Sequence, residues 1–202
     1  VQVPRVRNAT RLFAGHNHFC VLDTRQRLTC WGANSMGQTG SRRERRSPPR
    51  VVAGTGPIRS VSLGDDFSCL LNEDGGIRCW GDDFSNDGQP GPSHRPARHP
   101  TIANVTDIAL AGENLCFLIG GVPHCMGVNR RRELHVPTPE MGGIVIVPTA
   151  VPGVSGISGR ASLGGHFWLS GFLLFSQVFG PKAAGVPIQP SHHERFAGVI
   201  SG

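Results

Sequence analysis

LFAGHNHFCVLDTRQRLTCWGANSMGQTG, residues 12–40, decides the fold, because its pattern returns three times along the chain. The copies run over residues 61–91 and 108–129, with a more divergent one over 161–180. A glycine after the second cysteine position marks their phase, with steps of 49, 46 and 53 residues: Gly32, Gly81, Gly127 and Gly180. A period near 50 residues in a strand-rich sequence indicates a propeller or another repeat array.

The composition supports an all-β class. The chain has 202 residues, enough for one ordinary domain with a core, and its 28 glycines and 16 prolines indicate many turns. No segment sustains the apolar spacing of 3.6 residues that is typical of helices. We expect repeats at 1–56, 57–103, 104–153 and 154–180, followed by an irregular C-terminal tail at 181–202.

Six cysteines fall in three pairs, and each pair brackets a hairpin. In the third pair, a Gly120-Gly121 turn places Cys116 directly opposite Cys125, at a spacing that suits a disulfide. The same reasoning pairs Cys20 with Cys30 and Cys69 with Cys79. Reduced core cysteines and a metal site are the alternatives, although zinc prefers tighter knuckles that converge on one point. Three disulfides favour an oxidising compartment.

The predicted location is therefore extracellular or at the cell surface. Sequons at Asn8 and Asn104 occupy nearly the same place in repeats one and three, and both are candidate glycosylation sites; chance is the alternative. Neither end shows the pattern of a signal peptide, so a secreted protein would be represented here in mature or trimmed form. The most apolar stretch, residues 167–175, is too short to cross a bilayer, and no membrane span is predicted.

The formal charge is +6, with much of the excess in two short basic runs. One interpretation is two solvated loops, and the other is a patch for an acidic polymer such as an acidic glycan or nucleic acid. The candidate partner-binding residues are Arg42, Arg43, Arg45, Arg46, Arg130, Arg131 and Arg132.

Local patterns predict the strands of the first repeat at 11–14, 18–23, 27–31 and 50–53, with a Gly-rich loop at 34–40. Residues 90–100 are expected to form an exposed linker, and residues 144–147 an outer strand. The run at 43–46 before Ser47 has the R-x-R-R form that secretory convertases cut. We expect it to be accessible, because Pro48 and Pro49 delay the next strand until Arg50.

The motif G-H-x₃-C-x-L at 15–22 and C-W-G-x-N-x₂-G-Q-x-G at 30–40 resembles the regulator of chromosome condensation repeat family, and more narrowly its cysteine-bearing extracellular and bacterial branch. The resemblance covers roughly residues 5–180. It departs at Met126, which replaces the tryptophan of repeat three, and in repeat four, which lacks cysteines.

The resemblance implies a β-propeller, usually of seven blades of about 50 residues. Because about four repeats cannot close a seven-bladed ring, we expect a partial or divergent propeller-like array of about four blades. A fragment, a four-bladed ring and a homo-oligomer that completes the ring are the alternatives.

The predicted function is a non-enzymatic protein-interaction module that binds a partner through rim loops at 41–49, 82–100 and 130–138, which diverge while the hairpins are kept. His16 and His18 together resemble a catalytic or metal site. Because Asp65 takes the place of His16 in repeat two, we attribute the residue at this position to the fold. No catalytic set stands out, and no cofactor or metal is predicted; the acidic loop at 82–87 lacks the glutamate of an EF-hand. The family alternative is guanine-nucleotide exchange or chromatin binding, against which the disulfides argue.

Overall fold

The computed structural model describes residues 3–42, 44–82, 93–137 and 143–157. Within these ranges the chain is all-β and contains no helix. It forms three four-stranded antiparallel sheets, each with its strands in sequence order, which we call the first, second and third blades. The all-β, propeller-like prediction is confirmed. Residues 158–180 of the fourth expected repeat and the tail lie outside the described residues, so their boundaries stay a prediction.

Each blade takes four consecutive strands. The first blade consists of β1 (Ala9–Ala14), β2 (His18–Asp23), β3 (Leu28–Ala33) and β4 (Arg46–Val51). The second consists of β5 (Ile58–Leu63), β6 (Phe67–Asn72), β7 (Ile77–Gly81) and β8 (Ser93–Arg98). The third consists of β9 (Val105–Ala111), β10 (Asn114–Ile119), β11 (Val122–Val128) and β12 (Ile144–Ala150).

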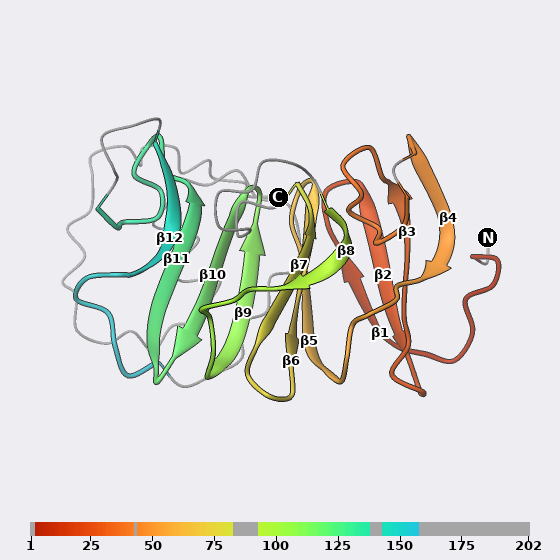
Figure 1. The fold of residues 1–202 in the computed structure, drawn as a ribbon, viewed down its shortest axis with the longest axis horizontal. Helices are drawn as coiled ribbons and strands as arrows, with labels where there is room; N and C mark the ends of the chain where they lie inside the picture. The colour runs from red at the N-terminus through yellow and green to blue at the C-terminus, as the bar shows by residue number, and fades with distance from the viewer. Residues whose placement is uncertain (1–2, 43, 83–92, 138–142, 158–202) are drawn as a thin grey trace, which may run out of the picture.

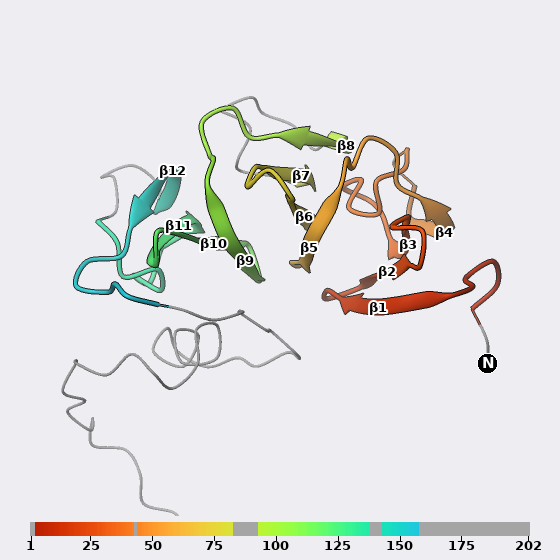
Figure 2. The same ribbon diagram turned by 90° about the horizontal axis from the view of Figure 1, so that it is seen from below.

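The three blades stand side by side in an arc (Figure 1). Seen from below, β1, β5 and β9 lie on the inner side of this arc, and each sheet extends outward from them (Figure 2). The loops that join β3 to β4 and β11 to β12 lie at the upper edge in Figure 1, which we call the upper rim. The β2–β3, β6–β7 and β10–β11 turns lie at the opposite edge, the lower rim.

The hairpin registers agree with the sequence prediction. Cys20 faces Cys30, Cys69 faces Cys79, and Cys116 faces Cys125. Each pair is joined by a disulfide, with S–S distances of 2.03, 2.08 and 2.11 Å. Every bridge therefore ties the second strand of a blade to its third strand, and none of them connects two blades.

Two outer strands differ from the prediction. β4 begins at Arg46 and includes Pro48 and Pro49, whereas the sequence indicated a start at Arg50. Likewise, the expected linker at 90–100 contains β8, with Pro96 inside it. Both strands are the last in their sheets, and both pair with their neighbours through a register shift. Proline is tolerated there because an edge strand has free N–H positions and a bulge leaves one residue unpaired.

The core lies between the blades. The disulfide face of the first blade packs against the second blade in one cluster: Cys20, Leu22, Leu28, Cys30, Val61, Leu63, Leu70 and Trp80. The disulfide face of the second blade packs against the third in the same way: Cys69, Leu71, Ile77, Cys79, Ile108, Leu110, Leu115, Phe117 and Met126. Each large apolar side chain buried in these seams contributes about 1.5–3 kcal/mol. Met126 is buried where the other repeats have tryptophan, so the replacement keeps the apolar seam.

Glycines bring the inner ends of neighbouring blades together. A Cβ on Gly15 would lie 2.6 Å from the Gly64 carbonyl oxygen, and one on Gly64 would lie 2.6 Å from the Gly112 carbonyl oxygen. The close approach lets the backbone N–H of His16 donate to Gly64 (3.2 Å) and that of Asp65 donate to Gly112 (3.0 Å). The glycine of the G-H motif is therefore required by contact with the next blade.

Removing one bridge tests the role of the disulfides. The double variant Cys69→Ala, Cys79→Ala should lose about 2–3 kcal/mol of unfolding free energy, because the bridge closes a short loop in the unfolded chain. Urea denaturation measures the loss. Peptide mapping of the parent chain without reductant should recover three links, each within one blade. A link between blades would contradict the register.

Candidate partner-binding rim

The upper-rim loop of the first blade is held from inside by Asn34. Its buried side chain donates from Nδ2 to the Arg42 carbonyl (2.8 Å) and to the Ser41 hydroxyl (3.1 Å), and its Oδ1 accepts from the Thr39 N–H (3.0 Å). These bonds satisfy the loop backbone without a regular ladder. The loop can therefore present its outer side chains from a fixed frame.

The third blade repeats this arrangement with a different sequence. The Oδ1 of buried Asn129 accepts from the Leu134 N–H (2.8 Å), and its Nδ2 donates to the Val136 carbonyl (3.2 Å). The five-residue spacing equals that from Asn34 to Thr39. Sequence reasoning missed this likeness because repeat three lacks G-Q-x-G. The retained signal is an asparagine two residues after the phase glycine, at Gly127 as at Gly32.

Gln38 joins the first-blade loop to the second blade. Its backbone carbonyl accepts hydrogen bonds from Trp80 Nε1 (2.9 Å) and Ser68 Oγ (2.8 Å), and its side-chain Nε2 donates to Asp66 Oδ1 (2.8 Å). Burial raises the pKa of the Asp66 carboxyl, and the nearby carboxylates of Asp65 and Asp82 add to the rise. Trp80 thus contributes a hydrogen bond to the contact between the blades as well as apolar burial.

The two histidines of the His16-Asn17-His18 segment lie in different environments. His18 is fully buried between the first two blades, with Nε2 2.8 Å from Ser68 Oγ, and burial lowers its pKa to about 4. His16 is exposed, with Nδ1 4.0 Å from Asp65 Oδ1. They do not converge on one point. In the described parts of the chain, no group of three or more His, Cys, Asp or Glu could hold a metal ion.

The structure places the candidate arginines on the upper rim, in two groups. Arg42, Arg45 and Arg46 are exposed at the first blade, and Arg130–132 are exposed at the third; Arg43 lies outside the described residues. Within the described ranges, no carboxylate forms an ion pair with any of these six side chains. The two loops are at opposite ends of the arc, so they share a rim but do not form one continuous patch (Figure 1).

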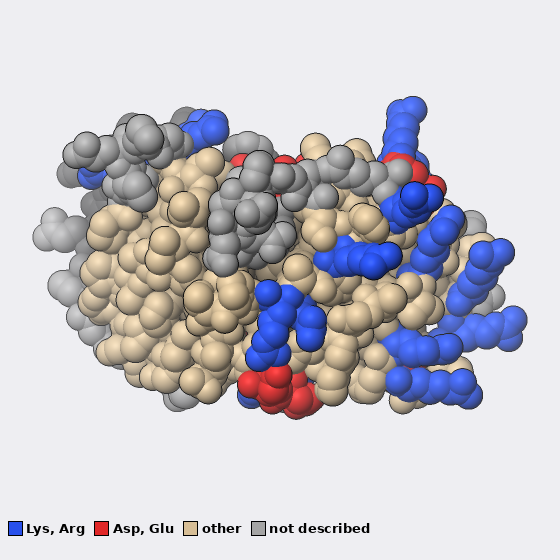
Figure 3. Space-filling model, in the orientation of Figure 1, with Lys and Arg blue, Asp and Glu red and all other residues tan. Residues whose placement is uncertain are grey.

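The positive charge extends beyond the two predicted runs. Residues 1–56 contain ten arginines and only two acidic residues, whereas the other 146 residues contain ten Lys or Arg and twelve Asp or Glu. Figure 3 shows basic side chains gathered over the end of the molecule formed by β1–β4, while the surface over β9–β12 in that view is nearly free of them. The first blade therefore forms a basic surface. This surface extends beyond the two short basic runs that were identified from the sequence.

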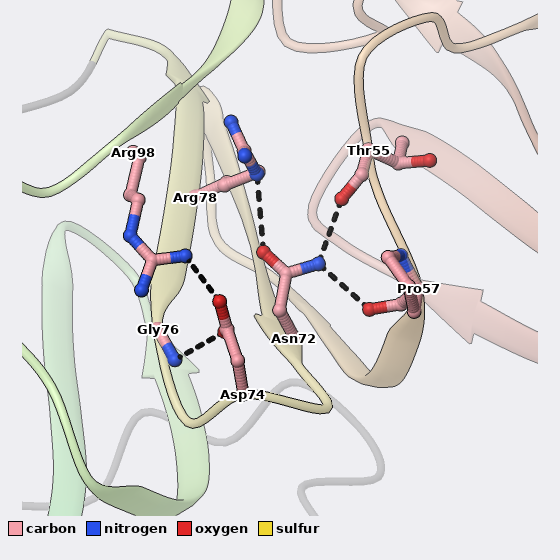
Figure 4. Close-up of polar contacts among 7 residues, drawn as sticks. All are labelled: Thr55, Pro57, Asn72, Asp74, Gly76, Arg78 and Arg98. Atoms are coloured by element: carbon pink, nitrogen blue, oxygen red, sulfur yellow. Dashed lines mark hydrogen bonds and ion pairs between the residues drawn. The ribbon is translucent and has the colours of Figure 1, made fainter.

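Basic groups at the lower rim of the second blade have structural partners (Figure 4). Arg98 Nη1 lies 2.6 Å from Asp74 Oδ2, and Arg78 Nε donates to Asn72 Oδ1 (3.1 Å). The Asp74 carboxylate also accepts from the Gly76 N–H, and this bond, followed by the one from Arg98, lowers the pKa of Asp74. These charges are used within the fold, unlike those of the upper rim.

The expected reason for an accessible cleavage site at residues 43–46 is wrong, because β4 begins at Arg46 and not at Arg50; cleavage itself stays a prediction. Ser47, which would follow the cut, lies inside β4 and is only 5% exposed. Its hydroxyl lies 3.0 Å from the Ser41 hydroxyl and donates to the Pro48 carbonyl (3.1 Å). A protease must bind an extended, accessible segment, and this bond is held in a sheet.

The two sequons occupy matching places, as the sequence indicated. Asn8 and Asn104 are exposed just before β1 and β9. In each, the sequon threonine hydroxyl donates to a carbonyl of the adjacent strand: Thr10 to Leu22 (3.0 Å) and Thr106 to Leu118 (3.3 Å). Their use for glycosylation stays a prediction. No helix in the described residues is long and apolar enough to cross a membrane.

Comparison with known proteins agrees with this architecture. The sequence profile of the Regulator of chromosome condensation (RCC1) repeat matches residues 10–38 and 58–89, which hold the disulfide-bridged hairpins of the first two blades. The first two blades therefore carry RCC1 repeats. The human probable E3 ubiquitin-protein ligase HERC6 is 28% identical over 194 residues, which are 87% of this chain and 19% of that protein.

Solved structures share the fold. Yeast RCC1 (Prp20) bound to Kap60 matches with a TM-score of 0.65 and 20% identity, over 73% of this chain and 37% of that one. Human WBSCR16 matches with a TM-score of 0.59 and 18% identity, over 71% and 38% of the two chains. The chain thus spans about a fifth of its human relative and less than two-fifths of these structures.

The buried His18 gives the first seam a pH dependence. Because the pKa is about 4 in the folded protein and about 6.5 when unfolded, the unfolded state binds more protons between these values. Stability is therefore full above about pH 6.5 and falls as the pH drops toward 4, by roughly 3 kcal/mol in total.

The variant His18→Asn, which uses the residue found at this position in the third blade, should lose that dependence. Urea midpoints of the parent chain and the variant, measured between pH 4 and 7, test this. The carboxyl groups titrate in both proteins, so the difference between the two profiles reports on His18 alone. Parallel pH profiles would contradict the assignment.

Proposed function

We propose that the chain is a non-enzymatic protein-interaction module that binds a partner through the upper-rim loops of its disulfide-stapled propeller. One observation carries the proposal. The first-blade loop is fixed from inside by Asn34 and Gln38, while Arg42, Arg45 and Arg46 point outward, exposed and without a carboxylate partner in the described structure. A rigid loop that presents unpaired charge is suited to recognition, because little order has to be gained on binding.

The charge suggests the chemistry of the partner. A basic first blade attracts acidic surfaces and speeds their association, so we propose a protein with an acidic patch; an acidic polymer is the second ligand class that would fit. The third-blade arginines, Arg130–132, would provide a second contact on the same rim. The three disulfides are compatible with an extracellular protein, and we propose that location.

Relatives support protein binding in general. Solved structures of yeast RCC1 describe it bound to Kap60 and report its binding to Gsp1p and histones. Those partners belong to that protein. Guanine-nucleotide exchange or chromatin binding remains the second candidate function. The reported binding of the yeast protein to Gsp1p and histones favours it, and the disulfides disfavour it, because they would not persist in a reducing nucleus.

Two charge-matched variants test the rim. The upper-rim variant replaces Arg42, Arg43, Arg45 and Arg46 with Gln; the control replaces Arg5, Arg7, Arg25 and Arg59, which lie outside the upper-rim loops. Each removes four positive charges. Each variant and the parent chain would be used to capture partners from secreted proteins, with quantification by mass spectrometry.

The upper-rim variant should lose a genuine partner about tenfold or more, the equivalent of roughly 1.4 kcal/mol, and the control should lose little. The captured interaction should also weaken as salt rises. Equal loss with both variants would indicate nonspecific charge attraction, and retention by both would exclude the upper rim as the binding site.

A further inference from the structure

A bulge near the start of each inner strand defines equivalent positions on the three blades. In each blade the pairing of the inner strand with the next strand skips one residue: Thr10, Arg59 and Thr106. Two positions before these residues the chain has Asn8, Pro57 and Asn104. The first and third blades therefore carry their Asn-x-Thr sequons at the same place in the fold, and the second blade has none there.

Both sequon asparagines lie at the lower rim. The Asn8 carbonyl accepts a hydrogen bond from the N–H of Thr24 (3.1 Å), which belongs to the β2–β3 turn. Val105, which follows Asn104, donates its N–H to the carbonyl of Gly75 (3.0 Å) in the β6–β7 turn. Both asparagines are exposed, so each side chain has room for a large group that extends into solvent.

The fold itself does not require a sequon at this place. Asn8 and Asn104 have φ angles of 54° and 58°, in the left-handed region that asparagine tolerates better than most residues. The second blade, however, enters its inner strand with Pro57 and places Arg59 at the skipped position. The turn and the bulge therefore form there without asparagine and without threonine, whereas the first and third blades have both together.

We propose that Asn8 and Asn104 carry N-linked glycans, which occupy the lower rim of the first and third blades and leave the upper rim open to a partner. The transfer forms a bond between Nδ2 of each asparagine and the anomeric carbon of an oligosaccharide carried on a lipid pyrophosphate. The bond from that carbon to the pyrophosphate breaks, the lipid pyrophosphate leaves with the electron pair, and an amide proton is released. This proposal rests on the extracellular location proposed above, since the oligosaccharide donor belongs to the secretory pathway.

The folded structure also indicates when the glycans are added. The hydroxyl of Thr10 donates to the Leu22 carbonyl on β2, and that of Thr106 donates to the Leu118 carbonyl on β10. A transferase needs the sequon as an accessible segment, and these bonds hold it against the neighbouring strand. Because each sequon precedes that strand in the sequence, it is synthesised first, and the glycan is added before the two strands pair.

Expression of the full chain behind a cleavable secretion signal, in cells that secrete glycoproteins, tests the proposal. The variants Asn8→Gly and Asn104→Gly, singly and together, remove the acceptors, and glycine keeps the positive φ of each turn. Thr10→Val and Thr106→Val form a second set, which keeps both asparagines and loses the sequons. Peptide N-glycosidase converts each glycosylated asparagine to aspartate, and peptide mass spectrometry then reads every site in the secreted and the cell-retained protein.

The parent chain should carry a glycan at both sites, each single variant should carry one, and the double variants should carry none. In the partner-capture experiment proposed above, the double variant Asn8→Gly, Asn104→Gly should retain the same proteins as the glycosylated parent, because the upper-rim arginines are unchanged. The folded double variant Thr10→Val, Thr106→Val serves as the matched control for any effect of the glycine replacements on capture.

An unmodified asparagine at either site, in both the secreted and the cell-retained protein, would overturn the proposal for that site. The residue would then serve its turn alone, and partner binding at the upper rim would be untouched. If both sites carry glycans and capture is lost in both double variants, the glycans belong to the binding surface. That result would overturn the separation of the two rims, whereas failure of the upper-rim arginine variant to lose a partner would overturn the proposed function and leave the glycans in place.

Discussion

The first seam depends on one contact, in which the rim-loop carbonyl of Gln38 in the first blade accepts a hydrogen bond from the Trp80 indole of the second. At the first seam the Gln38 carbonyl, bound by Trp80 and Ser68, connects the outer loop to the buried apolar cluster. A buried N–H without such an acceptor would cost about 1–3 kcal/mol. The seam and the rim are therefore not separate features, because the bond that closes the core also fixes the loop that faces solvent.

Within the rim loop, different residues therefore serve stability and recognition. Within the loop, buried side chains such as Asn34 make the structural bonds, so the exposed positions can vary without loss of the frame. At the lower rim the arrangement is reversed, since Arg98 and Arg78 are bonded to Asp74 and Asn72 and their charge is used within the blade. The same residue type thus serves the fold at one edge and is available to a partner at the other.

The features that could be predicted from the sequence are those that depend on local periodicity. Hairpin register followed from the turn glycines and cysteines, because a pair of opposed cysteines allows one alignment. The outer strands were missed, since Pro48, Pro49 and Pro96 argue against a strand unless its place at a sheet edge is known. The Asn129 loop was missed because its bonds go to backbone groups, which accept many sequences. The exposure of Leu12 and Phe19 could not be predicted, since it depends on which part of the protein lies next to them.

The two described seams also differ in chemistry. The first contains His18, Ser68, Gln38 and Asp66, four polar groups joined by hydrogen bonds across the blades. At the second, Leu115 and Met126 replace the serine and the tryptophan, so apolar contact takes the place of those bonds. Because apolar contact does not titrate, the protonation of His18 acts on the first seam, where the basic first blade meets the second.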